Sequence, residues 1–250
     1  MGRYKFALAH LLVSLTVASI VAGIVFLAWF PAPYDRLAGG RELFSILISV
    51  DVIIGPILTC IVFSPLKSKK TLIVDVFVIA GLQVGALAYG VFSVTMARPV
   101  ILAAENKMFR VVSANGVKID ELAQAPTEYR QLSWTGPRLV GVRRSGTPQE
   151  LLQAIDLAKQ GYDTGTRPSY WVPYSDIQRR VLEQAVPLTN LQERSLGHNQ
   201  AITAAAFSVQ KKMDDLSALP LMARQNGWYV LLDRKTAEVL GFARLEPLKE

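Results

Sequence analysis

One apolar run with a carboxylate in its middle constrains this chain more than any other feature. The run, LFSILISVDVIIGPILTCIVFS, spans residues 43–64 and has about the length that crosses a bilayer as a helix. Its carboxylate is Asp51. A charged side chain near the middle of a membrane costs roughly 2.5 kcal/mol or more, so it normally faces protein or water instead of lipid. The run therefore predicts a membrane helix that packs against other helices.

The same run is interrupted one turn after its carboxylate, at Gly55 and Pro56. A proline inside a helix has no backbone N–H to donate, and its ring clashes with the carbonyl four residues earlier. Sharp helix kinks usually lie at such prolines. We therefore expect a kink at Gly55-Pro56.

Two further apolar runs, residues 6–30 and 71–96, flank the first one. The whole chain of 250 residues is 51% hydrophobic and only 19% charged, which is more apolar than an ordinary soluble domain. The run over 6–30 is longer than the apolar core of a secretory signal, about 7 to 15 residues, so we interpret it as an uncleaved anchor. The fold class predicted for residues 1–97 is an α-helical membrane bundle of three transmembrane helices, over about 6–30, 43–64 and 71–96.

Basic residues beside these runs predict their orientation in the bilayer. Arg3 and Lys5 precede the first run, and three lysines at 67, 69 and 70 separate the second run from the third. Such residues stay on the cytoplasmic side. We therefore expect a bacterial inner-membrane protein with a cytoplasmic N-terminus and a periplasmic domain over 98–250. Because much of the net charge of +7 is this topology signal, it does not indicate nucleic-acid binding, which usually shows a concentrated basic face.

Polar residues inside the predicted helices can be placed by depth, at about 1.5 Å per residue. Counted from the cytoplasmic ends of the runs, His10 and Asp75 are both about 6 Å deep, while Asp51 and Gln83 are about 20 and 18 Å deep. We therefore expect two polar layers, His10 with Asp75 and Asp51 with Gln83. Such layers mostly fix helix register; contact with another membrane helix is the alternative. The difference in depth argues against two carboxylates sharing one protease site.

Three glycines of the third run, Gly81, Gly85 and Gly90, form the predicted surface for helix packing or partner contact. The spacing Gly81-x-x-x-Gly85 lets a second helix approach closely, because small residues expose the backbone to it. The bilayer itself is the other expected surrounding of these helices.

Residues 98–250 have the size of one water-soluble domain. Three strands are predicted over 99–104, 108–113 and 139–143, and a terminal hairpin over 227–232 and 237–245. Three helices are predicted, from the capping box at Thr147 to Gly161, from Ser175 to Pro187, and over 201–213. The expected class is an α+β domain.

This domain shows no recognisable catalytic motif. Its one histidine, His198, has no cysteine or second histidine beside it for a metal site, and there is no Gly-rich phosphate loop. We therefore expect no cofactor, no metal and no enzymatic activity. The most distinctive segment is a proline-bounded loop with Tyr170, Trp171 and Tyr174. These aromatics are candidate anchors for a periplasmic partner, although packing onto the domain is the more common role of such residues.

The membrane half carries a family resemblance. The series Asp51-x-x-x-Gly55-Pro56-x-Leu58-Thr59, then Asp75, Gln83, Ala86, Gly90 and Arg98-Pro99-Val100, resembles the type IV pilin accessory proteins of the TfpX/TfpZ group. The end of the chain, from Leu219-Pro220-Leu221 through the hairpin, resembles them more loosely.

This resemblance implies a non-enzymatic, chaperone-like accessory factor of the inner membrane that binds pilin and assists type IV pilus biogenesis or assembly. Its partners would be the apolar helix and the periplasmic head of a type IV pilin, together with other pilus assembly proteins.

Other function classes remain open. A pilin-modifying transferase would need a carboxylate or basic cluster at the periplasmic surface, and modified pilin found only when this protein is present would favour it. A membrane-anchored periplasmic ligand-binding module is a further alternative. A sensor would need a cytoplasmic output module, and the predicted cytoplasmic segments are too short to fold.

Overall fold

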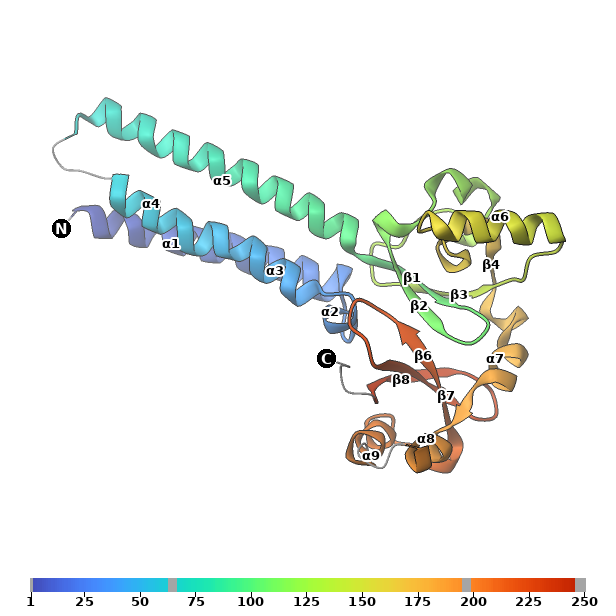
Figure 1. Cartoon of the computed structure of the whole chain (residues 1–250). Helices are drawn as coiled ribbons and strands as arrows, with labels where there is room; N and C mark the ends of the chain where they lie inside the picture. Colours follow the sequence, from blue (N-terminus) through green and yellow to red (C-terminus); the bar gives the residue numbers. More distant parts are fainter. Residues whose placement is uncertain (1, 63–66, 195–198, 246–250) are drawn as a thin grey trace. The chain divides into compact units, whose positions relative to one another are not determined.

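The computed structural model describes residues 2–62, 67–194 and 199–245. The chain forms two compact units, Met1–Arg98 and Pro99–Glu250 (Figure 1). The first unit is helical, and the second combines helices with a mixed sheet. The prediction of three long apolar helices followed by an α+β domain is therefore confirmed.

The helical unit consists of three long helices, two of which contain a π-helical stretch. Its elements are α1 (Gly2–Gly23) with the π-helical Ile24–Trp29, the short α2 (Tyr34–Leu37), α3 (Gly40–Ile48), the π-helical Ser49–Ile54, α4 (Gly55–Val62) and α5 (Lys69–Ala97). Among the described residues, three helices are long and apolar enough to cross a membrane, Tyr4–Trp29, Gly40–Val62 and Lys70–Ala97. Residues 63 and 64 of the predicted second helix lie outside the described residues.

A small apolar core holds these helices together at one end. Val25, Phe30, Phe44, Leu47 and Val94 are buried against one another. Most other large apolar side chains of the unit point outward, among them Phe77 and Leu82 of α5 at 74% and 69% exposed. A helix that is apolar on its outer face suits lipid or a further apolar helix.

The sheet of the second unit has eight strands in the described part of the chain. Its order is β4-β3-β1-β2-β6-β7-β8, with β5 beside β6; β1·β3 and β2·β6 are parallel pairs and the others antiparallel. The strands are β1 (Pro99–Ala104), β2 (Phe109–Ser113), β3 (Arg138–Val142), β4 (Trp171–Val172), β5 (Val186–Pro187), β6 (Leu216–Met222), β7 (Trp228–Asp233) and β8 (Val239–Arg244).

The helices cover the two halves of this sheet separately. They are α6 (Pro148–Lys159), α7 (Gln178–Gln184), α8 (Leu188–Arg194) and α9 (Asn199–Ser208). Ala154 of α6 packs into a core with β1 to β4, while Leu188 of α8 and Ile202 of α9 pack into another with β6 to β8. Figure 1 shows α6 and α9 at opposite parts of the domain. Single-turn 3-10 helices lie at Ala114–Gly116, Thr127–Tyr129, Thr164–Thr166, Pro168–Tyr170, Tyr174–Asp176 and Met213–Asp215, and a longer one at Ile119–Gln124.

Some predicted helix bounds are wrong. Thr147 does cap α6, since its hydroxyl accepts from the Glu150 N–H, but Ser175 caps nothing and α7 begins at Gln178. The predicted helix over 201–213 ends at Ser208, because Gln210 has a φ of 54°, which breaks a right-handed helix.

Candidate functional site

A cluster of polar side chains lies inside the helical unit, where α1, the irregular second helix and α5 meet. His10 Nδ1 lies 2.5 Å from Thr59 Oγ1, and the Gln83 amide donates a long hydrogen bond of 3.4 Å to the backbone carbonyl of Asp51. A Cβ placed on Gly55 would lie 2.0 Å from Gln83 Nε2 and 3.2 Å from His10 Nε2. Gly55 is thus the position that makes room for the other side chains.

The Gly55-Pro56 pair explains why a backbone carbonyl is available there. The N–H of Gly55 bonds to the carbonyl of Val50, five residues back, as in a π-helix. In this register the partner of the Asp51 carbonyl would be the N–H of Pro56, which proline lacks. The carbonyl accepts from Gln83 instead. A π-helical stretch, Ser49–Ile54, directly precedes Gly55, and the kink expected at Gly55-Pro56 stays a prediction.

The carboxylate of Asp51 lines a cavity beside this cluster. Its Oδ1 atom is buried and has no hydrogen-bond partner among the described residues. The cavity has a volume of about 180 Å³ and is lined by His10, Val13, Ser14, Val17, Asp51, Ala80, Gln83, Val84 and Leu87. A buried carboxylate oxygen in such a space can accept a hydrogen bond from water or from another polar group.

The predicted pairing of His10 with Asp75 is wrong. Asp75 forms an ion pair with Lys67, with Nζ and Oδ2 2.7 Å apart, and His10 lies with Gln83 instead. The depth count assumed that the apolar runs over 6–30 and 71–96 begin at one level. The contacts at Gly55 instead place His10 beside Gln83, which lies eight residues after Asp75 on α5.

The three predicted packing glycines of α5 differ in their surroundings. A Cβ on Gly90 would lie 2.2 Å from Leu47 Cδ1, whereas nothing lies within 4 Å of a Cβ on Gly81 or Gly85. Gly90 therefore serves packing inside the helical unit. Gly81 and Gly85 lie on its exposed face.

The aromatic loop of the second unit is not a partner surface. Tyr170 and Trp171 are 0% and 1% exposed, and the Trp171 indole N–H donates to the carbonyl of Gly165 at 2.9 Å. Tyr174 donates its hydroxyl to the Ala237 carbonyl at 2.6 Å. The loop thus packs onto the domain, which is the alternative that the sequence already favoured, because Tyr170 and Trp171 belong to the core of β1 to β4 and the ring of Tyr174 lies beside that of Phe109.

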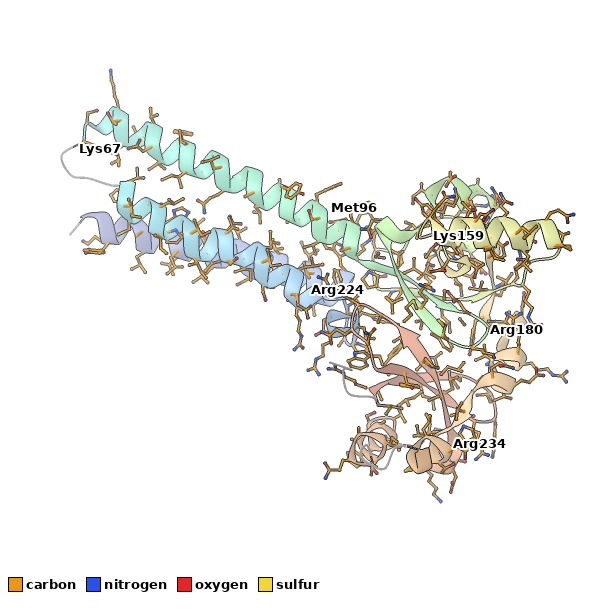
Figure 2. The ribbon with its side chains drawn as sticks, viewed as in Figure 1. Lys67, Met96, Lys159, Arg180, Arg224 and Arg234 are labelled. Atoms are coloured by element: carbon orange, nitrogen blue, oxygen red, sulfur yellow. The ribbon has the colours of Figure 1, made fainter. Side chains whose placement is uncertain are left out.

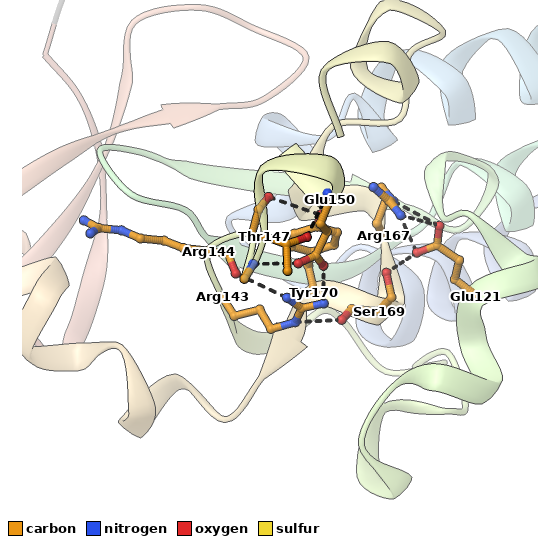
Figure 3. Close-up of polar contacts among 10 residues, drawn as sticks. Glu121, Arg143, Arg144, Thr147, Glu150, Arg167, Ser169 and Tyr170 are labelled. Atoms are coloured by element: carbon orange, nitrogen blue, oxygen red, sulfur yellow. Dashed lines mark hydrogen bonds and ion pairs between the residues drawn. The ribbon is translucent and has the colours of Figure 1, made fainter. Parts of the chain in front are cut away.

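Arginines and carboxylates surround Tyr170 (Figure 3). The guanidinium carbons of Arg143 and Arg167 lie 4.5 and 4.8 Å from the centre of its ring. Arg167 pairs with Glu121 at 2.9 Å, and the Ser169 hydroxyl donates to the same carboxylate. Sequence reasoning missed this ion pair because its partners lie 46 residues apart and nothing in the local pattern joins them.

Glu150 completes the other side of this network. Its carboxylate accepts from Arg143 at 2.6 Å and from the Gly146 N–H at 2.6 Å, and these two donors lower its pKa to about 2. The capping box at Thr147 was the only sequence signal for this position. Because these charges are paired with one another, the network stabilises the loop.

Within the described ranges, no group of three or more His, Cys, Asp or Glu side chains could hold a metal ion. His198 lies outside the described residues.

Comparisons with known proteins place the chain in a family. The profile of the family described as fimbrial assembly protein FimB matches residues 1–39. The chain is 34% identical over 227 residues to the fimbrial assembly protein, serogroup I, of Dichelobacter nodosus, an alignment that covers 90% of this chain and 88% of that protein. The chain belongs to the FimB family of fimbrial assembly proteins.

Other relatives of the same organism carry similar names. The fimbrial assembly protein of serogroup E1 is also 34% identical over 227 residues, with the same coverage. That of serogroups C1 and C2 is 40% identical over 116 residues, or 46% of this chain and 88% of that protein. No solved structure matches the chain. The narrower TfpX/TfpZ grouping rests on the sequence motif alone.

Proposed function

We propose that this protein is a non-enzymatic accessory factor of the bacterial inner membrane that binds type IV pilin and assists fimbrial assembly. The observation that carries the proposal is the 34% identity with proteins named for fimbrial assembly over 90% of this chain. Because that similarity extends through both units, we infer that the role needs both of them.

The exposed face of α5 supports pilin as the partner of the helical unit. Gly81 and Gly85 have no neighbour within 4 Å of a Cβ position, and the large side chains around them, Phe77 and Leu82, are exposed. Helices associate in lipid mainly where small residues let the backbones approach. A pilin presents one apolar helix, so this face would be its binding surface.

The polar cluster would hold the face of α5 in its orientation. The amide of Gln83 joins α5 to the Asp51 carbonyl. This contact would fix the rotation of α5 about its own axis relative to the second helix. Residues 99–250 would then lie in the periplasm, near the pilin head, because the basic residues beside the helices predict a cytoplasmic N-terminus.

A reporter that is active only in the periplasm tests this orientation. We expect activity from a fusion after Glu250 and none from a fusion at Ser68. The reverse pattern would overturn the periplasmic placement of the domain.

Photo-crosslinking in cells tests pilin binding directly. A photoreactive residue at position 85 should form an adduct that mass spectrometry identifies as pilin, and the same residue at 90 should not, because Leu47 fills that site. Adducts with pilin from 90 but from neither 81 nor 85 would contradict the proposed surface.

The mass of pilin from cells with and without this protein tests the non-enzymatic part of the proposal. A modification of pilin that requires the protein would show a transferase.

A further inference from the structure

A second cavity lies within the α+β domain, at an edge of its sheet. It has a volume of about 570 Å³, and its lining includes Glu105, Asn106, Arg144, Leu151, Thr164 and Arg180. Strands β1 and β3 are parallel neighbours, so their carboxyl ends meet here; Glu105 follows β1, and Arg143 follows β3 on the way to α6. Ligands of open α/β sheets bind at the carboxyl ends of parallel strands.

Two positive charges of this cavity are not neutralised. Arg143 is paired with Glu150 at 2.6 Å, and Glu105 with Arg110 at 2.7 Å. Among the described residues, neither Arg144 nor Arg180 forms an ion pair with a carboxylate. Arg144 donates only to the Asn106 amide oxygen, at 3.2 Å, and Figure 3 shows its guanidinium directed away from Glu150 and Tyr170.

Arg180 forms a hydrogen bond to the backbone but also has a buried N–H without a partner among the described residues. It lies on α7 (Figure 2), and its Nη2 donates to the Val142 carbonyl. Its Nε is buried without a hydrogen-bond partner in the described part of the chain. Burial lowers the pKa of this guanidinium, and the charge of Arg144 lowers it further. A bound anion would offset the repulsion between the two arginines.

Part of the lining is apolar and part of it is polar, with Asn106, Ser145 and Thr164 among the polar residues. Val142, Pro148 and Leu151 contribute side chains to the same cavity. Small-molecule sites typically have volumes of about 300 to 1,000 Å³ with an apolar lining and a few polar groups that orient the ligand. The cavity therefore combines space for an apolar body with two donors for one charged group.

We propose that this cavity binds an oxyanion, either a carboxylate or a phosphate, carried by a small molecule with an apolar body, and that Arg144 and Arg180 are its charged donors. A guanidinium presents its N–H groups in a fork that matches both kinds of oxyanion. This site is independent of pilin binding by the helical unit.

Calorimetry on the purified full chain in detergent, at constant ionic strength, tests the site. The probes are phenyl phosphate, inorganic phosphate and benzyl alcohol. We expect phenyl phosphate to bind more tightly than inorganic phosphate and benzyl alcohol not to bind in the same range. Each of Arg144→Gln and Arg180→Gln should weaken phenyl phosphate binding by about tenfold, the effect of losing one hydrogen bond to a charged group.

The matched control is Arg179→Gln, which removes the same charge from the residue just before Arg180 on α7, where the side chain is 94% exposed. It should leave the affinity unchanged. Leu151→Glu is a second variant, and it leaves Arg180 unchanged. Leu151 lines the cavity and is 52% exposed, so the protein should fold with glutamate there. The introduced carboxylate should repel the probe and abolish binding. Absence of phenyl phosphate binding to the unmodified chain would overturn the proposal. So would unchanged affinity in Arg144→Gln and Leu151→Glu, or an equal loss in Arg179→Gln.

Discussion

Two buried carboxylates, Glu121 in the α+β domain and Asp51 in the helical unit, differ in how far their oxygens are hydrogen-bonded. In the domain, Glu121 is 6% exposed and is bound by both Arg167 and Ser169. In the helical unit, Asp51 has a carboxylate oxygen without a hydrogen-bond partner among the described residues, and its backbone carbonyl has only a long bond to Gln83.

This difference separates a carboxylate with a structural role from one that can still accept a hydrogen bond. A buried ion pair is strongly destabilising when one partner is lost, so the domain's network has a purely structural explanation. The carboxylate of Asp51 is incomplete by the same standard, while Pro56 explains why its backbone carbonyl is free to accept from Gln83. Within the helical unit, Asp51 is therefore where we expect a polar group to serve a partner or a change of helix packing.

The largest expected effect is in the domain. Glu121→Gln removes the charge that balances Arg167, and we expect the free energy of unfolding of the domain to fall by about 3 kcal/mol or more. Hydrogen exchange of the β1 amides in the full chain measures it. The control is Asp156→Asn, whose ion pair with Lys159 is 68% and 71% exposed and should contribute less than about 1 kcal/mol. Equal effects of the two variants would remove the contrast between the domain's buried and surface charges.

A methyl group at Gly55 should have the next largest effect. Gly55→Ala places a Cβ where the Gln83 amide lies, so the side chain must move, and we expect a destabilisation of about 1 to 3 kcal/mol, as for overpacked cores. Gly81→Ala is the matched control, because its Cβ meets nothing within 4 Å. Thermal unfolding in detergent compares them, and addition of Gln83→Ala should restore part of the loss. If Gly55→Ala and Gly81→Ala behaved alike, the cluster would not be closely packed.

A double-mutant cycle tests the origin of the free carbonyl. Gln83→Leu should destabilise the helical unit by about 0.6 to 1 kcal/mol, a typical value for a hydrogen bond between membrane helices. In a Pro56→Ala background the new N–H can satisfy the Asp51 carbonyl, and the same substitution should then cost less. Thermal unfolding of the four proteins gives the coupling energy. A coupling of zero would show that Pro56 is not the reason for the Gln83 contact.

The smallest effect is the response of the domain to acid. The pKa of Glu150 is lowered from 4.5 to about 2, below its value in an unfolded chain, so its contribution to stability is present above about pH 4.3. That contribution is lost as the pH falls from there toward 2. Unfolding of the full chain by urea, followed between these pH values, should show less pH dependence for Glu150→Gln. If the free energy of unfolding depended on pH equally in Glu150→Gln and in the unmodified chain, the Arg143 contact would contribute nothing to stability.

The sequence predicted what local patterns determine. Apolar length specified the three helices, the hairpin pattern specified β7 and β8, and Thr147 specified the start of α6. It did not predict β6 at the centre of the sheet, because Pro220 lies in that strand and proline cannot donate to a ladder.

Contacts between residues far apart in the sequence were harder to predict. Depth counting placed Asp51 near Gln83 but assigned His10 to Asp75, since it assumed that the first and third apolar runs begin at one level, and the sequence gives no information on how two helices are shifted along each other. The arginines at 144 and 180 line one cavity because the fold brings β3 and α7 together, and no spacing in the sequence indicates this.

The central claim is that the exposed glycine face of α5 binds pilin. Gly85→Leu fills that face without meeting a neighbour inside the protein, and we expect the amount of pilin that co-purifies with the full chain from membranes to fall by about tenfold, or about 1.4 kcal/mol. Gly23→Leu on α1 is the control, because its Cβ position is equally open, and it should retain pilin. Full pilin recovery with Gly85→Leu, at normal levels of inserted protein, would contradict the account.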